Sequence, residues 1–410
     1  MSNARQQEHH HGPSMRTGLI AILAILVLLL GAVGYFVFTL LEPVGAPSSQ
    51  DLPEGLSWVR SIYGYGAGED QRFIAPAHVD IADDGTIWVS DTQMNAVMSF
   101  SPDGTPRSRI DLQPLVTEGQ LSPKGIEVGA DGRLYICANN AARLLILSAD
   151  GELLEAWEID NPLDVTLSGD RVFVTSPAGV TVFSREGEVV GTWGGRGKAE
   201  DQLDVPQGIV VGDDDVVYVA DTLNARVKAF TQEGQLLWAT APGMSGGGNV
   251  PGGASAGESE ESTPAQSGTG MQLPAGLCMD ANGRLVLADP FGFEVVVLDP
   301  TKQGEIVGRY GEFGSADGYF AYPLGMAYDA ERDWFAVADV ANARVQIIRI
   351  GGSGDAGLIP AARRAATGPI WICCMPLGLL LLILFAALAS KKRPRDGVLQ
   401  VDGDSADEDD

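Results

Sequence analysis

Two stretches of this sequence carry the same polar motif, D-x-x-N-A-R, followed by an apolar run. The copies span residues 221–226 and 339–344, and two further aspartates occupy the first position of the motif elsewhere. A carboxylate, an amide and a guanidinium this close together suit a ligand site, but they also brace tight turns. Recurrence favours the structural interpretation, because one active site is not built several times in one chain. We predict that six side chains hold strand connections, with the aspartates accepting backbone N–H groups of the next few residues: Asp91, Asp221, Asn224, Asp289, Asp339 and Asn342.

Candidate binding residues stand where a second recurring element changes. A proline followed two residues later by glycine opens four similar segments, and His78 and Asp164 replace that glycine in two more. Lys124 and Gln207 stand one residue before this position in two of the others. These four side chains either bind a small ligand or a metal, or form the polar lining of a solvated opening. His78 is the only histidine after residue 11, so a zinc site built from several histidines is excluded.

Sequence patterns of common enzymes are missing. The chain has no H-E-x-x-H, C-x-x-C or phosphate-binding loop, and no G-x-S-x-G in a strand-to-helix setting. We therefore predict no catalytic residue and no cofactor, while a divalent metal at the polar opening stays an alternative. The formal net charge of −27 argues against nucleic acid as a partner. Cys137 and Cys278 stand singly in strand-like runs and are predicted to be small core residues.

The elements that position these residues repeat six times between residues 57 and 350. Each unit has a proline opening, an Asp- or Gly-rich turn, an apolar run ending in V-x-D or a variant of it, a third apolar run and a second turn. Asp-Gly and Asn-Gly pairs supply the positive φ that tight hairpins need. Four short strands per unit at a spacing of roughly 40 residues are typical of a propeller blade. The fold class is therefore predicted as all-β, a six-bladed β-propeller.

The pattern resembles the NHL-repeat family, whose blades carry the same P-x-G, V-x-D and N-x-R-V elements. The resemblance covers about residues 57–350 and implies a six-bladed propeller of the bacterial, membrane-anchored kind. Four units match well. The second has Ala138 in place of the aspartate and the third has lost both the aspartate and the arginine, so these two blades depend on their strand pattern.

The two ends of the repeat region are complementary. Residues 57–64 match the last strand of a unit whose beginning is missing, and the sixth unit stops after its third strand at Ile350. We predict that the N-terminal segment supplies the outer strand of the last blade. The linkers 42–56 and 351–368 then leave from one face, and the opposite face carries the proline openings. A Gly-, Ser- and Glu-rich insert at 242–270, between the fourth and fifth blades, is predicted to be disordered.

Two apolar segments flank the propeller, and each is long enough to cross a bilayer. We predict transmembrane helices at 17–41 and 369–390, a cytoplasmic tail at 1–16 and an acidic cytoplasmic tail at 391–410. Basic residues before the first segment and directly after the second place both ends in the cytoplasm and the propeller outside it. The first segment exceeds the roughly 7 to 15 apolar residues of a signal peptide, which favours an uncleaved signal anchor over a cleaved one.

These expectations combine into a function. A rigid disc anchored in the cell membrane without an assembled catalytic set suits a module that binds or scaffolds another envelope or membrane protein, as a sensor or an accessory subunit of a larger complex. The alternative is a metal-dependent hydrolase or lyase that uses the mouth of the propeller channel.

Overall fold

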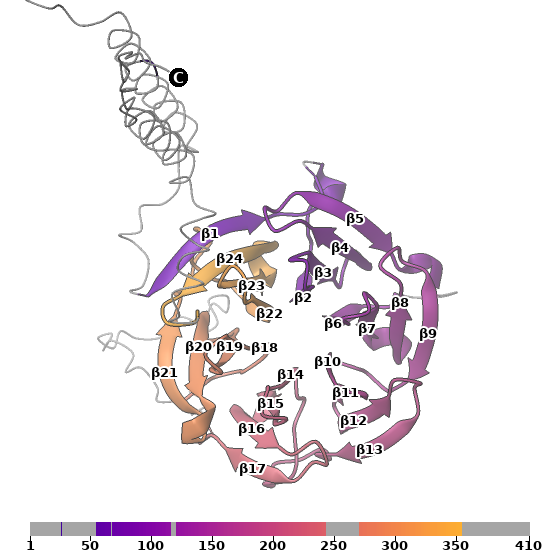
Figure 1. The fold of residues 1–410 in the computed structure, drawn as a ribbon, viewed down its shortest axis with the longest axis vertical. Helices are drawn as coiled ribbons and strands as arrows, with labels where there is room; N and C mark the ends of the chain where they lie inside the picture. The colour runs from indigo at the N-terminus through magenta and orange to yellow at the C-terminus, as the bar shows by residue number, and fades with distance from the viewer. Residues whose placement is uncertain (1–25, 27–54, 67, 116–119, 243–269, 355–410) are drawn as a thin grey trace, which may run out of the picture. The chain divides into compact units, whose positions relative to one another are not determined.

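The computed structural model describes residues 55–66, 68–115, 120–242 and 270–354, together with Leu26. These residues form six four-stranded antiparallel sheets arranged around one axis (Figure 1). Each sheet is one blade, with its first strand nearest the axis and its last strand at the rim. The prediction of an all-β, six-bladed propeller is confirmed, including the second and third blades, in which the motif is incomplete.

The strands are short and similar in length from blade to blade. The first blade contains β2 (Pro76–Ile81), β3 (Ile87–Asp91), β4 (Ala96–Phe100) and β5 (Pro106–Asp111), and the second contains β6 (Pro123–Val128), β7 (Leu134–Ala138), β8 (Arg143–Leu147) and β9 (Leu153–Glu158). The third contains β10 (Asp164–Ser168), β11 (Arg171–Ser176), β12 (Gly179–Ser184) and β13 (Val189–Trp193), and the fourth contains β14 (Gly208–Val211), β15 (Val217–Asp221), β16 (Arg226–Phe230) and β17 (Leu236–Ala239). The fifth contains β18 (Leu277–Met279), β19 (Leu285–Asp289), β20 (Glu294–Asp299) and β21 (Glu305–Tyr310). The sixth contains β22 (Pro323–Asp329), β23 (Trp334–Asp339), β24 (Arg344–Ile350) and β1 (Leu56–Ile62).

Short 3-10 turns lie at several strand connections and loops. They are η1 (Glu69–Gln71), η2 (Gln113–Leu115), η3 (Asn139–Ala141), η4 (Thr222–Asn224), η5 (Pro300–Lys302) and η6 (Val340–Asn342). The predicted positive φ occurs at the hairpin glycines, for example 81° at Gly85 and 84° at Gly234. The turns η3, η4 and η6 each end at an alanine in the left-handed conformation, which glycine adopts more easily. These residues are Ala142, Ala225 and Ala343, with φ near 50°. The side-chain networks described below hold the last two of these turns.

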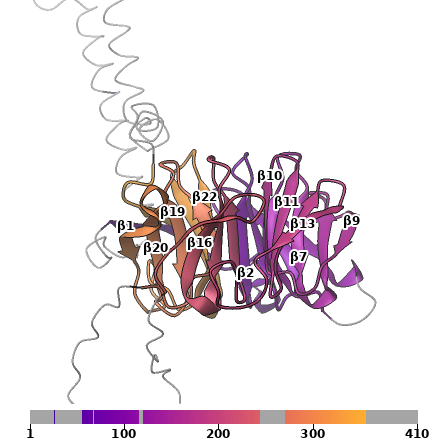
Figure 2. The same ribbon diagram turned by 90° about the horizontal axis from the view of Figure 1, so that it is seen from below.

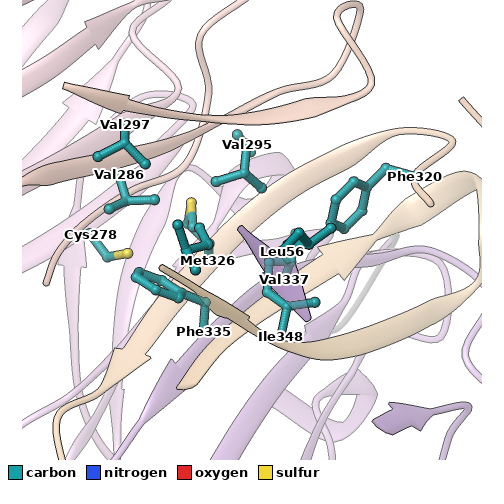
Figure 3. Packing of buried hydrophobic residues seen from close by; sticks show 12 residues of the cluster. Leu56, Cys278, Val286, Val295, Val297, Phe320, Met326, Phe335, Val337 and Ile348 are labelled. Atoms are coloured by element: carbon teal, nitrogen blue, oxygen red, sulfur yellow. The ribbon is translucent and has the colours of Figure 1, made fainter. Parts of the chain in front are cut away.

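The N-terminal segment closes the ring, as predicted. Strand β1 pairs with β24, so Leu56 lies opposite Ile350 and Ile62 lies opposite Val345. Leu56 also enters the hydrophobic cluster between the fifth and sixth blades, where it lies near Phe320 and Ile348 (Figure 3). The last blade therefore contains chain from both ends of the repeat region, which links the two ends of the ring by backbone pairing.

Two faces of the disc differ in what they carry (Figure 2). The mouth face carries the start of each inner strand, the connections between the second and third strands, and the connectors between blades. The exit face carries the other two sets of turns and both chain ends, since Gly351 N donates to Gly55 O at 2.8 Å. Asn282, in a turn of the exit face, donates to the carbonyl oxygens of Gly352 and Gly354 at 2.6 and 2.9 Å. Pro242 and Gly270, which border the predicted insert, both lie on the mouth face.

Several predicted segments fall outside the described residues. These are both transmembrane segments apart from Leu26, both tails, nearly all of the linkers and the interior of the insert. Within the part of the chain that the structure describes, no helix combines the length and the apolar character needed to span a bilayer.

Candidate functional site

The repeated polar motif builds a brace for the connectors between blades. Asp221 accepts hydrogen bonds from the backbone N–H of Asp204 at 2.7 Å and from the Asn224 amide at 2.9 Å. Arg226 Nε donates to Asp221 at 2.8 Å, and its Nη2 donates to two carbonyl oxygens of the preceding connector. Lys228 is completely buried and lies 3.4 Å from Asp221. Its ammonium donates to the carbonyl oxygens of residues 199, 200 and 202.

The sixth blade repeats this brace with one substitution. Asp339 accepts from the backbone N–H groups of Ala321 and Tyr322, from Asn342 at 2.7 Å and from Arg344 Nε at 3.1 Å. Gln346 stands where the fourth blade has Lys228 and donates to Tyr319 O at 2.7 Å. Asp91 and Asp289 likewise accept the backbone N–H groups of the two residues just before the proline that opens their own blade.

These contacts sharpen the structural prediction. Asp91 and Asp289 accept N–H groups from the residues that follow them, as expected. All four aspartates also bind the connector that enters the inner strand of their own blade, 16 to 18 residues upstream. The sequence spacing gave no sign of this second contact. The carboxylate oxygens of the motif are occupied by these hydrogen bonds. The motif residues therefore hold the connectors of the mouth face in place.

A small pocket opens at the centre of the mouth face. It has a volume of about 90 Å³ and is lined by side chains or backbone from all six blades. Three of the four predicted binding residues, His78, Lys124 and Gln207, line it. Asp164 lies behind His78 and is 2% exposed. The structure thus brings the four residues together at the axis, from four different blades.

His78 and Asp164 form an ion-pair contact across the axis. His78 Nε2 lies 3.2 Å from Asp164 Oδ1, although the two groups are not aligned for a hydrogen bond. Asp164 Oδ2 accepts the backbone N–H of Ile209 in the next blade at 3.0 Å. Burial acts to lower the pKa of His78, but the charges of Asp164 and Asp80 outweigh it, so the pKa is raised. The His78–Asp164 contact therefore lies at the floor of the pocket.

The His78–Asp164 pair fits at the axis because the neighbouring inner strands have glycine at the equivalent position. A Cβ atom on Gly125, in the blade between the pair, would lie 2.6 Å from the Cα of Asp164. A Cβ atom on Gly325, in the blade before His78, would lie 2.5 Å from the Cα of His78. The inner strands approach each other so closely here that side chains fit at only two of the six equivalent positions.

Two further acidic residues near the axis were missed from the sequence. Asp80 and Glu127 stand two residues after the positions of His78 and Gly125, on the same side of their strands. Asp80 Oδ2 accepts the N–H of Val128 in the next blade at 2.7 Å. Burial raises the pKa of Asp80, and burial with the charges of Asp80 and Asp164 raises that of Glu127 well above its ordinary value. Residues two apart in a strand lie on the same face, so the positions two residues after His78 and Gly125 could have been identified from the sequence.

No metal site is assembled by these groups. Among residues 55–66, 68–115, 120–242 and 270–354, no three or more His, Cys, Asp or Glu side chains are placed to hold one metal ion. Cys137 and Cys278 are buried free thiols, and burial raises the pKa of each well above its ordinary value. Acid–base chemistry by His78 and Asp164 is what the arrangement at the axis offers.

Away from the axis, the mouth face exposes aromatic side chains. Phe291 and Phe293 lie in the connection before β20, and Phe313 and Tyr322 lie in the connector before β22. Phe291 packs edge-on against Tyr322 with centroids 6.0 Å apart, and Phe293 packs against Phe313 at 4.8 Å. Phe313 is 65% exposed and Phe291 is 52% exposed. We call these four residues the aromatic patch.

Comparisons with known proteins agree with this architecture. The family model described as NHL repeat matches residues 203–230, which contain the brace of the fourth blade. A comparison with curated protein sequences found no match. Among solved structures, a structural genomics protein of unknown function from Bacteroides thetaiotaomicron is similar in fold, with a TM-score of 0.52 and 14% identity over 72% of this chain and 75% of that one.

Two structures of named enzymes are more distant. Virginiamycin B lyase from Staphylococcus aureus has a TM-score of 0.45 and 16% identity over 66% of this chain and 79% of the lyase. A gluconolactonase from Xanthomonas campestris has a TM-score of 0.48 and 17% identity over 72% of this chain and 98% of that one. At these values neither likeness bears on activity. The protein is therefore a closed six-bladed β-propeller whose fourth blade matches the NHL repeat.

Proposed function

We propose that this propeller is a binding module that docks another protein, a membrane or envelope protein, on its mouth face. The aromatic patch carries the proposal. Exposed clustered aromatic side chains are typical of the centre of a protein interface, where they bury a large area at little cost in side-chain entropy. In a chain with a formal net charge of −27, they give the mouth face an uncharged contact surface.

The loops that present the patch are held rigidly. Asp289 binds the backbone at Gln272, Leu273 and Gly292, next to Phe291 and Phe293. Asp339 and Arg344 bind the backbone of the connector that carries Phe313 and Tyr322. A surface that is already ordered loses little conformational entropy when a partner binds. The brace therefore supports the docking role as well as the fold.

Substitution on each side of the disc tests the docking surface. The full-length protein, solubilised in detergent after cross-linking in native membranes, is compared with F291A/F313A and with L153A/L154A. The control pair is also exposed, but it lies in β9 near the exit face. Loss of two aromatic anchors should weaken a complex by at least about 2 kcal/mol, roughly 30-fold. Recovery of the same partner with F291A/F313A, or no specific partner with the wild type, would refute the proposal.

We also propose that the chain crosses the cell membrane twice, with the propeller outside the cytoplasm. The apolar segments at 19–41 and 370–390 support this, as do the basic residues on their predicted cytoplasmic sides. The exits at Gly55 and Gly351 are adjacent on one face, which would leave the mouth face free for a partner.

Cysteine labelling tests this topology. In a background in which serine replaces Cys373 and Cys374, a membrane-impermeant maleimide is added to intact cells. Leu223→Cys, at an exposed site of η4, should react, and Ser405→Cys in the C-terminal tail should react only after lysis. The opposite pattern would show that the propeller faces the cytoplasm.

A second candidate function is a hydrolase or lyase at the mouth pocket. The buried His78–Asp164 pair favours it, since a histidine oriented by a carboxylate is a common general base. The described residues do not fit a divalent metal, so the metal-dependent form of this candidate needs an ion to be found. A stoichiometric ion in the purified protein that is lost in Asp164→Asn would favour the enzyme, and absence of such an ion would favour the docking module.

A further inference from the structure

Lys124 presents an unused positive charge to the mouth pocket. Its side chain lines the pocket, and no described residue accepts a hydrogen bond from its ammonium or lies within ion-pair distance of it. Burial lowers the pKa of Lys124. The contrast with Lys228 is informative, because that buried lysine has three carbonyl oxygens and Asp221 as partners. The fold thus supplies partners for the ammonium of Lys228, which has a structural role, and leaves the ammonium of Lys124 available to a ligand.

Gln207 adds a second open donor on another side of the pocket. Its backbone N–H is used by Thr222 Oγ1 at 3.1 Å, but no described residue binds its side-chain amide. The remaining wall is largely apolar and contains Gly125, Gly276, Gly325 and the side chains of Ala77, Leu163 and Leu324. An ammonium and an amide N–H that line one small space are suited to recognise an anion.

The negative groups nearby are already occupied. Asp164 faces His78 and the N–H of Ile209. Asp80 accepts the N–H groups of Ile81 and Val128. Burial and the charges of Asp80 and Asp164 raise the pKa of Glu127 well above its ordinary value. These contacts leave Lys124 as the charge that dominates the open end of the pocket.

We propose that the mouth pocket binds a carboxylate group, with Lys124 as its counter-ion and Gln207 as a hydrogen-bond donor. The volume of about 90 Å³ accommodates a carboxylate group, and the pocket is open at the mouth face, so the rest of the ligand can extend out of it. Phosphate sites generally use arginine forks or several backbone N–H groups, and the pocket has neither. The carboxylate belongs either to a free small molecule or to the chain end of a docked polypeptide.

Calorimetry on the full-length protein in detergent micelles tests this site with defined probes. N-acetylglycine is compared with N-acetylglycinamide, and a Gly-Gly-Gly-Ala peptide with a free carboxyl terminus is compared with its amidated form. The acids should bind and the amides should not. Binding of N-acetylglycine itself would point to a small molecule as the source, and binding of the peptide alone would point to a chain end.

Matched variants assign the contact. Lys124→Gln should weaken binding of the acid at least tenfold, and Gln207→Leu should weaken it severalfold. Lys302→Gln, at an exposed lysine remote from the axis, should leave binding unchanged. Equal affinity for acid and amide, no effect of Lys124→Gln in a protein with an unchanged melting temperature, or no binding of any probe would each overturn the proposal. The site is independent of the aromatic patch, so F291A/F313A should retain acid binding.

Discussion

His78 in the first blade and Asp164 in the third approach each other to 3.2 Å, because the blade between them contributes only Gly125 at the same level. The pair replaces two glycines of the repeat and closes the centre of the ring. It also places a titratable imidazole beneath a pocket whose other open donor groups are Lys124 and Gln207. Part of the pH dependence of the propeller's stability should therefore reflect this contact.

The first prediction concerns the titration of His78. Burial lowers its pKa and Asp164 raises it, with a raised net value. Asp164→Asn removes the larger of the charges that raise this pKa, so the pKa of His78 should fall. Histidine-selective NMR measures this directly, because the other three histidines lie within the first 11 residues. An unchanged titration in Asp164→Asn would contradict the ion pair.

The same pair has a defined effect on stability. A group whose folded pKa lies above its unfolded pKa of about 6.5 stabilises the fold fully below that pH, and the effect disappears as pH rises through the folded pKa. His78→Gln should therefore destabilise the protein more at pH 6 than at pH 9. Urea unfolding of variant and wild type at the two pH values measures the difference. Equal destabilisation at both would mean that His78 contributes packing alone.

The buried carboxyl group of Glu127 should make folding stability depend on pH, and replacement by glutamine should remove this dependence. Its folded pKa is raised by burial and by Asp80 and Asp164, so stability falls as pH rises above the unfolded pKa of about 4.3, and the loss is complete above the folded pKa. Glu127→Gln should increase stability by about 1 kcal/mol at pH 9 and have little effect at pH 4. Glu158→Gln is the control, because that side chain is 86% exposed. A destabilised Glu127→Gln at pH 9 would show that the carboxylate is favourably held.

The ring of six blades was predictable because its signals are local and repeated. Asp-Gly turns, the proline openings and the ends of the second strands recur with one spacing, and each copy supports the others. Closure of the ring followed from the same comparison: the repeat region begins with the one strand that the last unit lacks, predicted at 57–64 and found at Leu56–Ile62. His78 and Asp164 were identifiable as departures from glycine at one position of the repeat.

The contacts between blades were not predictable in the same way. Nothing in the sequence indicates that residues of the first and third blades meet, because this depends on the small radius at the axis. The exposed patch is a second case, since Phe313 and Phe320 lie in the same connector and only Phe320 is buried. Lys228 is a third: its position after N-A-R-V is compatible with an exposed strand residue, and only the path of residues 199–202 covers it.

Removing the buried ammonium of Lys228 should be costly. Lys228→Met keeps the length of the side chain but leaves Asp221 and three carbonyl oxygens with one partner fewer. Breaking a buried, hydrogen-bonded ion pair costs about 3 kcal/mol or more. Lys302→Met, at a half-exposed lysine, should change stability by less than about 0.5 kcal/mol. Chemical denaturation compares the two, and a loss for Lys228→Met no greater than that of the control would mean that the brace adds little.

Leu56 should report on ring closure. It is the first residue of β1, lies opposite Ile350 and is buried between the fifth and sixth blades. Leu56→Ala should cost about 2 to 3 kcal/mol, since truncation of a buried leucine loses transfer energy and leaves a cavity. Ser57→Ala, the next residue on the same strand, is exposed and should cost less than about 0.5 kcal/mol. Hydrogen exchange on the Leu56→Ala protein should show faster exchange first in β1 and β24, because their backbone pairing joins the two ends of the ring. Uniformly faster exchange in all six blades would instead mean that the ring unfolds as one unit, without a weak point at its closure.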